Sequence, residues 1–286
     1  MDIKAGVELD CSIWGPTELE LQISTAAMDG LEVSEHLAVE LGGEPVELVE
    51  AIGEVDTRVH SFRPGDGRLA IRYSATISAS ADTSTSADTS LSAGSSASTS
   101  PSVVSGWEVA RFRRPSRYCE SDLLGNLAAD IVADVRSDPA ATVVRISDWV
   151  ADHFRYTPGV TGPSDTARSV LIGRRGVCRD YTHAVVALAR AIGFPARYVC
   201  VYAPGLSPMD LHAVAEIAVE GRWYVVDATR LAPRQSLVRI ATGMDAADVS
   251  FLTNYGGICN LHSITAHASV DGDLPVDDHS GLVPAP

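Results

Sequence analysis

Short alternations of apolar and polar residues mark the first part of the chain, as they do in half-buried β-strands. Residues 18–23 alternate in this way, so Leu19, Leu21 and Ile23 would share one buried face. Similar runs follow at residues 46–48, 55–59 and 69–73. Turn signals occur at residues 42–43 and 64–67. The pattern predicts a small, β-rich antiparallel domain over residues 1–77.

A change of composition separates this part from the rest. Residues 78–102 contain eleven Ser and four Thr in 25 positions, and Leu91 is their one large apolar side chain. Such a stretch cannot bury enough apolar surface to offset the entropy lost on ordering. We therefore expect a disordered insertion or linker over residues 78–106.

Helical and strand patterns then mix, which predicts an α/β domain over residues 107–270 and a flexible tail over residues 271–286. Three helices are expected before the most informative segment: one from Ser121-Asp122 to Val135, one over residues 142–154, and a short one from Ser164-Asp165 to Gly173.

Cys178 lies at the start of a further helical pattern. The repeat runs through three apolar positions and ends at a glycine: Val185, Leu188, Ile192 and Gly193. Unpaired amides and the helix dipole at such a position favour a thiolate, and Arg175 and Arg179 add positive potential. Gly176 would let the backbone bend and leave space for a substrate. The alternative interpretation is a buried cysteine at an ordinary helix start.

A predicted hairpin supplies a base for this thiol. Residues 211–219 and 222–227 have strand patterns, and Glu220-Gly221 makes a two-residue turn between them. His212 and Asp227 then project from one face as diagonal neighbours, about 7–8 Å apart at the backbone. The carboxylate can hold one imidazole nitrogen while the other is aimed at a thiol. A one-residue slip would put the two side chains on opposite faces.

The other histidines and carboxylates form no comparable arrangement. His183 follows Cys178 by five residues, about 140° around a helix, so we expect a packed histidine. No spacing fits a metal site or an EF-hand, and no glycine-rich phosphate motif occurs. We expect neither a metal nor a cofactor, and no calcium requirement.

Net charge, hydropathy and cysteine content further limit the classes of partner, location and metal site that the chain could have. The 286 residues carry a formal charge of −15, which disfavours nucleic acids and anionic membranes. No apolar run reaches the roughly 20 residues of a membrane helix, and the first residues lack a signal-peptide core, so we expect a cytoplasmic protein. Five widely spread cysteines argue against a disulfide framework and a zinc ribbon. Four of them are expected to be reduced core residues.

The cysteine, the histidine and the aspartate also lie in a recognisable order. Four segments together resemble the transglutaminase-like superfamily: residues 176–181 around the cysteine, 189–199 with Gly193-Phe194-Pro195-Ala196-Arg197, His212-Ala213, and 221–229 with Trp223 and Asp227-Ala228-Thr229. The core of the resemblance spans about residues 157–230. Residues 116–122 and 254–257 are similar to the bacterial branch, which commonly has an N-terminal β-rich domain.

The resemblance implies a papain-like α+β fold, in which the helix-start cysteine packs on an antiparallel sheet. It also implies a triad: Cys178 as nucleophile, His212 as acid and base, and Asp227 as the residue that orients the imidazole. Asp180 matches a frequent family position, which we interpret first as a helix N-terminal anion and second as a substrate contact. Two departures concern Ala228, where the family often has proline, and Val214, where it often has an aromatic residue.

Acyl transfer is the chemistry that follows. The thiolate of Cys178 would attack an amide carbonyl of a protein or peptide, and water or an amine would resolve the thioester. The Cys178 backbone N–H is the natural oxyanion donor, and Tyr156 is a candidate second donor. Hydrolysis, as in a peptidase or amidase, is favoured over cross-linking by the resemblance. The alternative is a non-catalytic protein- or peptide-binding module that retains the fold.

Overall fold

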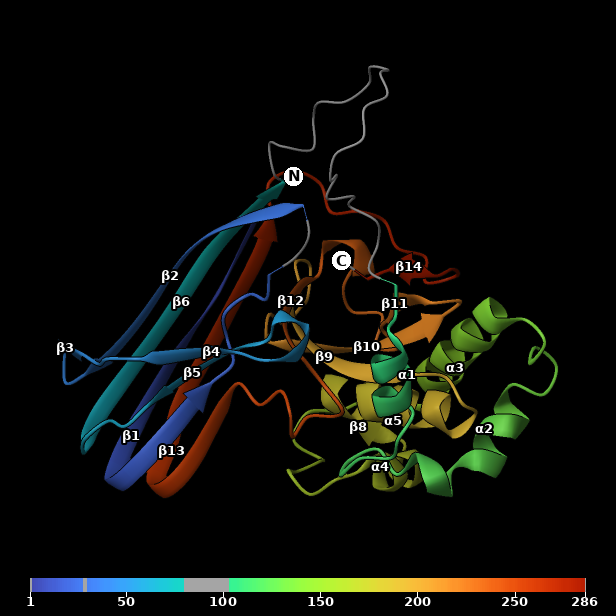
Figure 1. Ribbon diagram of the computed structural model, residues 1–286, viewed down its shortest axis with the longest axis horizontal. Helices are drawn as coiled ribbons and strands as arrows, with labels where there is room; N and C mark the ends of the chain where they lie inside the picture. Colours follow the sequence, from blue (N-terminus) through green and yellow to red (C-terminus); the bar gives the residue numbers. More distant parts are fainter. Residues whose placement is uncertain (1, 28–29, 80–102, 286) are drawn as a thin grey trace, which may run out of the picture.

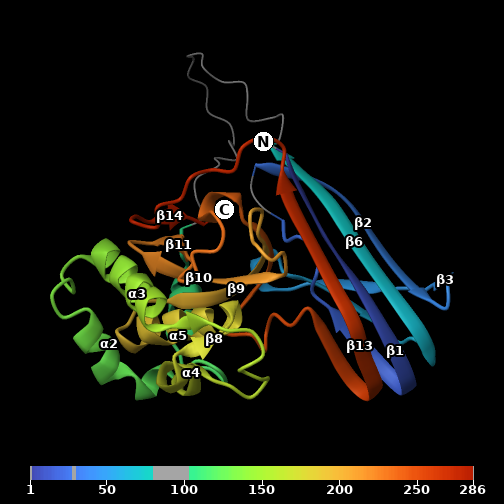
Figure 2. The same cartoon turned by 180° about the vertical axis from the view of Figure 1, so that it is seen from behind.

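The computed structural model describes residues 2–27, 30–79 and 103–285. Most of the Ser/Thr-rich stretch, residues 80–102, lies outside the described residues. Two antiparallel sheets lie side by side, and the helices cover the far side of the second sheet (Figures 1 and 2). No helix of the described residues is long and apolar enough to span a membrane.

The first sheet has seven strands in the order β3-β2-β6-β1-β5-β4, and β13 pairs with the other side of β1. Its strands are β1 (Ile3–Leu21), β2 (Leu31–Leu41), β3 (Glu44–Pro45), β4 (Val49–Ile52), β5 (Arg58–Phe62), β6 (Gly67–Ala79) and β13 (Leu252–Val270). Leu19, Leu21 and Ile23 are all buried as predicted, although β1 ends before Ile23. The sequence therefore indicated the buried face of this sheet correctly.

Other predicted strands differ from the structure. Residues 46–48 connect β3 and β4 instead of forming a strand. A 3-10 turn at Glu54–Asp56, where Val55 and Asp56 have positive φ, interrupts the run predicted over 55–59. Strand β2 was not predicted, because most of its side chains are exposed or half-buried and its alternation is weak.

The second sheet carries the candidate chemistry. Its order is β12-β9-β10-β11-β14, with β9 (Ala196–Tyr202), β10 (His212–Val219), β11 (Arg222–Val226), β12 (Val238–Gly243) and β14 (Val283–Pro284). The helices are α1 (Gly106–Phe112), α2 (Gly125–Ile131), α3 (Pro139–His153), α4 (Ala167–Gly173) and α5 (Cys178–Ala191). Four short elements follow: 3-10 turns at Ser121–Leu123 and Arg234–Ser236, and the parallel strands β7 (Arg155–Tyr156) and β8 (Arg175–Gly176).

Predicted helices with a strong apolar repeat agree best with the structure. α3 covers the helix predicted over 142–154, and it begins three residues earlier because Asp138 caps it and Pro139 opens it. The helix predicted from Ser121 to Val135 is instead a 3-10 turn followed by the two-turn α2. Helix α4 begins after Thr166, and α1 was not predicted.

Near its C-terminal end the chain adds one strand to the first sheet and then one strand to the second sheet. β13, which the predicted domain of residues 107–270 included, pairs with β1 along the whole of that strand. β14 pairs with β11, and Arg234 forms a buried ion pair with Asp277. The predicted boundary at residue 270 therefore does not follow the sheets, and the segment expected to be a flexible tail contacts the core.

One apolar cluster joins both halves. The buried face of the first sheet contributes residues such as Leu9 and Tyr73, and the second sheet contributes Tyr202 and Ile240. The rings of Tyr73 and Tyr202 stack with centroids 6.2 Å apart, and the Tyr202 hydroxyl donates to the Ile23 carbonyl at 2.6 Å. Cys178 packs against this shared cluster.

Candidate active site

The first residue of α5 is Cys178, and its side chain is half-buried. The short parallel pair β7–β8 fixes the approach to the helix, because Tyr156 aligns with Gly176 and Thr157 N–H donates to the Gly176 carbonyl at 2.8 Å. The helix then runs inward, and its residues from 180 to 190 are all buried. The thiol is thus held at a helix N-terminus, as predicted.

Asp180 closes this helix start. Its Oδ2 accepts hydrogen bonds from the Val177 N–H at 2.8 Å and from the Thr161 hydroxyl at 2.7 Å. The side chain is fully buried, so it binds the helix start and leaves no surface for a substrate. The interpretation of Asp180 as a helix N-terminal anion agrees with these contacts, and its use as a substrate contact does not.

Gly176 serves the same junction. A Cβ added at this position would lie 2.4 Å from Asp180 Oδ2, which is far inside van der Waals contact. The expectation that Gly176 leaves room for a substrate is therefore corrected. The missing side chain makes room for the carboxylate that caps α5.

The hairpin β10–β11 has the predicted register. Ala215 faces Val226 and Val219 faces Arg222, with Glu220-Gly221 as the turn between the strands. No one-residue slip occurs, so His212 and Asp227 project toward the same side. His212 is the first residue of β10, and Asp227 follows the last residue of β11.

A buried hydrogen bond joins these two side chains. His212 Nε2 lies 2.9 Å from Asp227 Oδ2, and both side chains are about 1% exposed. The other carboxylate oxygen accepts from the Thr229 backbone N–H at 2.9 Å and from its hydroxyl at 2.7 Å. Thr229 thereby fixes the orientation of the Asp227 carboxylate. The sequence signal for this role was the position of Thr229 in the Asp227-Ala228-Thr229 segment.

The electrostatics of the pair favour charge on both groups. Burial alone would lower the pKa of His212, but the charge and hydrogen bond of Asp227, with the neighbouring Cys178 thiol, raise it to about 10. Burial would raise the pKa of Asp227, but His212 and Thr229 hold it below its ordinary value. The His212 ring therefore stays in its positively charged imidazolium form throughout the neutral pH range.

The second imidazole nitrogen, Nδ1, is aimed away from the carboxylate. It is buried and makes no hydrogen bond within the described residues. The Cys178 side chain lies near this ring and contributes to its raised pKa. The structure thus brings together Cys178, His212 and Asp227, the three residues that the sequence singled out.

Tyr156 lies beside the thiol on β7, with 39% of the residue exposed. Burial and the Cys178 side chain raise the pKa of its hydroxyl to about 12, and the hydroxyl also contacts the Cys178 backbone N–H. A phenol that stays protonated beside that N–H is suited to hydrogen bonding with an oxyanion. The position fits the role considered for Tyr156.

Two residues near the thiol were not anticipated. Tyr198 of β9 is buried, and the Cys178 side chain contributes to the raised pKa of its hydroxyl. Asp210 is exposed two residues before His212, and its charge acts on Tyr156. Neither lies in a motif, and only the approach of β9 and the preceding loop to α5 brings them near the site.

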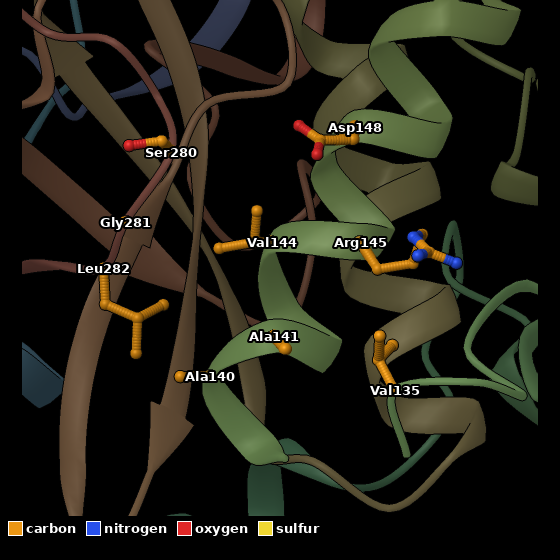
Figure 3. Close-up of a pocket in the computed structure, with 9 residues that line it drawn as sticks. All are labelled: Val135, Ala140, Ala141, Val144, Arg145, Asp148, Ser280, Gly281 and Leu282. Atoms are coloured by element: carbon orange, nitrogen blue, oxygen red, sulfur yellow. The ribbon is translucent and has the colours of Figure 1, made fainter. Parts of the chain in front are cut away.

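The remaining candidates lie elsewhere. His183 is buried between the rings of Tyr118 and Tyr198, and its Nε2 accepts the Ala246 N–H at 3.2 Å, as a packed histidine does. Among the described residues no group of three or more His, Cys, Asp or Glu could hold a metal ion. A cavity of about 420 Å³ lies between α3 and residues 280–282 (Figure 3), and Cys178 is not among the residues that line it.

Known proteins share this architecture. The model of the transglutaminase-like superfamily matches residues 126–228. A crystal structure of a "putative cysteine protease" from Cytophaga hutchinsonii is similar over 99% of this chain and 96% of that chain, with a TM-score of 0.82 and 27% identity. These findings confirm the predicted transglutaminase-like core and the β-rich region before it.

A relative is also found by sequence. An uncharacterized protein of Mycobacterium leprae, ML0607, is 30% identical over 125 residues. The match covers 40% of this chain and 43% of that protein, so the chain spans less than half of its length. It is similar in sequence but adds no activity.

Proposed function

Because residues 126–228 belong to the transglutaminase-like superfamily, we propose that the chain is a cysteine peptidase or amidase that acts on a protein or peptide. The observation that carries the proposal is the buried His212–Asp227 pair, whose second imidazole nitrogen has no hydrogen-bond partner among the described residues and whose ring lies near the Cys178 side chain. A nucleophile, a base and a group that orients the base are the parts that thiol catalysis requires.

The reacting form is an ion pair in which the proton of the Cys178 thiol resides on His212 Nδ1. The raised pKa of His212 keeps the imidazolium protonated next to the thiolate, and Asp227 stabilises its charge. The thiolate attacks the amide carbonyl, and the oxyanion is bound by the Cys178 backbone N–H and the Tyr156 hydroxyl. His212 then protonates the leaving nitrogen, and water hydrolyses the thioester.

Alkylation of Cys178 tests the activated thiol without knowledge of the substrate. Wild type, His212→Ala and His153→Ala are treated with iodoacetamide across a range of pH, and each cysteine is read by peptide mass spectrometry. His153 is an exposed histidine on α3 and serves as the matched control. We expect Cys178 to react fastest in wild type and in His153→Ala, and at least about tenfold more slowly in His212→Ala.

Equal rates at all five cysteines, or no effect of His212→Ala, would contradict the proposal and leave a binding role for the fold. A peptide mixture of known sequences, incubated with and without a fluorescent primary amine, then separates the reactions. Hydrolysis gives new carboxyl termini that Cys178→Ala abolishes. Incorporation of the amine in place of water would show transfer instead.

A further inference from the structure

Two cysteines of the first sheet lie on adjacent strands and on the same face. In the register of β1 and β13, Cys259 is opposite Ile13, and Cys11 is opposite Leu261. Directly opposed residues share a face, so Cys11 and Cys259 are diagonal neighbours on the buried side. They come from opposite ends of the sequence and meet only because β13 returns to β1.

A bulge lies beside these two residues. A register shift lies between Asp10 and Cys11, where β13 carries one extra residue. Such a bulge increases the local twist of the strand pair. Each thiol acts on the pKa of the other, Cys11 as hydrogen-bond donor and Cys259 as acceptor, in agreement with their positions as neighbours in the register.

The two thiols differ in access. Cys11 is fully buried, and burial together with Cys259 raises its pKa to about 12. Cys259 is half-buried on β13, where most neighbouring residues are exposed. Among the described residues β13 pairs only with β1, so it is an edge strand of the first sheet. A disulfide needs Cα atoms within about 7 Å of each other, and any adjustment toward that distance falls on this edge strand.

We propose that Cys11 and Cys259 form a dithiol that a low-molecular-weight disulfide such as glutathione disulfide converts into a disulfide bond between β1 and β13. Cys259 attacks one sulfur of glutathione disulfide, forms a mixed disulfide and releases one glutathione thiol. Cys11 then attacks the Cys259 sulfur and releases the second glutathione. The two protein thiols lose their hydrogens, and the small disulfide is reduced to two thiols.

The disulfide would link β13 covalently to β1. It closes a loop that contains nearly the whole chain, and it constrains the unfolded state accordingly. The site is separate from Cys178 and needs none of the proposed catalytic groups. The odd cysteine count and wide spacing gave no indication of the pair, because the pairing depends on the β1–β13 register.

The test uses the Cys178→Ala chain, so that the candidate nucleophile does not compete for the oxidant. After incubation with glutathione disulfide and quenching of free thiols, digestion without reductant should yield a peptide that links Cys11 to Cys259. The melting temperature should rise by at least about 4 °C, fall back on reduction, and not change in Cys178→Ala/Cys259→Ser.

Other outcomes would overturn the proposal. These are a stable glutathione adduct on Cys259 with Cys11 still free, a disulfide that joins Cys11 or Cys259 to Cys119 or Cys200, and two cysteines that stay reduced. Cys119 and Cys200 are buried in the second half of the chain and serve as internal controls for nonspecific oxidation. The activity of wild type is measured separately, so failure of this proposal leaves the proposed function intact.

Discussion

His212 is a buried histidine that holds a positive charge. The desolvation of the ring favours the neutral form, and the carboxylate 2.9 Å away more than offsets this cost. A pKa raised to about 10 in the folded chain also contributes to stability. That contribution is complete below the ordinary histidine value of about 6.5 and is lost as the pH rises through about 10.

Asp227→Asn should reverse the sign of this shift. Without the carboxylate charge, burial dominates, and the pKa of His212 should fall below its ordinary value. We expect the His212 ring resonances to titrate near pH 10 in wild type and below pH 7 in Asp227→Asn, as measured by NMR. Asp122→Asn, at an exposed aspartate, should leave the titration unchanged. The same midpoint in both variants would show that Asp227 does not control the imidazole.

The sequence predicted which side chains meet, but not which imidazole nitrogen each partner contacts. The two-residue turn fixed the register, and the period of two then fixed the shared face of His212 and Asp227. The choice of Nε2 for Asp227 depends on the rotation of the ring, which the packing around it sets. No pattern in the sequence reports that rotation.

The start of α5 shows how one element prepares the site. Asp180 accepts the Val177 N–H, binds Thr161 and fills the space beside Gly176. The helix start is therefore rigid where the thiol is attached. A side chain at position 176 would have to displace the capping carboxylate.

Gly176→Ala should destabilise the fold by about 1–3 kcal/mol, because the methyl group would overlap Asp180 in a buried position. Urea unfolding followed by circular dichroism measures the change. Gly173→Ala at the end of α4 is the matched control, since an added Cβ meets nothing within 4 Å there. Equal stability of the two variants would show that the junction relaxes freely around the extra methyl group.

Elements with strong periodicity were predictable, and weakly buried ones were not. α3 and α5 place regular apolar repeats against the second sheet, so their sequences carry a clear signal. β2 and α1 bury few side chains, and their sequences carry little. Residues 46–48 alternate like a strand, yet the chain turns there between two short strands.

The long-range pairings exist only at the scale of the whole molecule. β13 completes a sheet that β1 begins, and β14 pairs with β11 beside the strand end that carries Asp227. Local composition gives no information on partners so far apart along the chain. The predicted boundary at residue 270 missed these returns for that reason.

A buried ion pair fastens the C-terminal segment to this sheet. Arg234 binds both carboxylate oxygens of Asp277, and its guanidinium also donates to the Gly281 and Val225 carbonyls. The two charged side chains are 6% and 3% exposed. Removing one partner of such a pair leaves a buried charge uncompensated.

Asp277→Ala should therefore cost about 3 kcal/mol of unfolding free energy and make residues 271–285 more susceptible to limited proteolysis. The arginine and backbone donors hold the pKa of Asp277 well below its usual range. Its contribution is thus present above the unfolded value of about 4 and declines as the pH falls below it, so the two proteins should converge in acid. Asp278→Ala, at the exposed neighbour, removes only an exposed hydrogen bond from the Ser280 N–H and should cost far less. An equal loss in both variants would show that the segment is held by its backbone pairing and not by the ion pair.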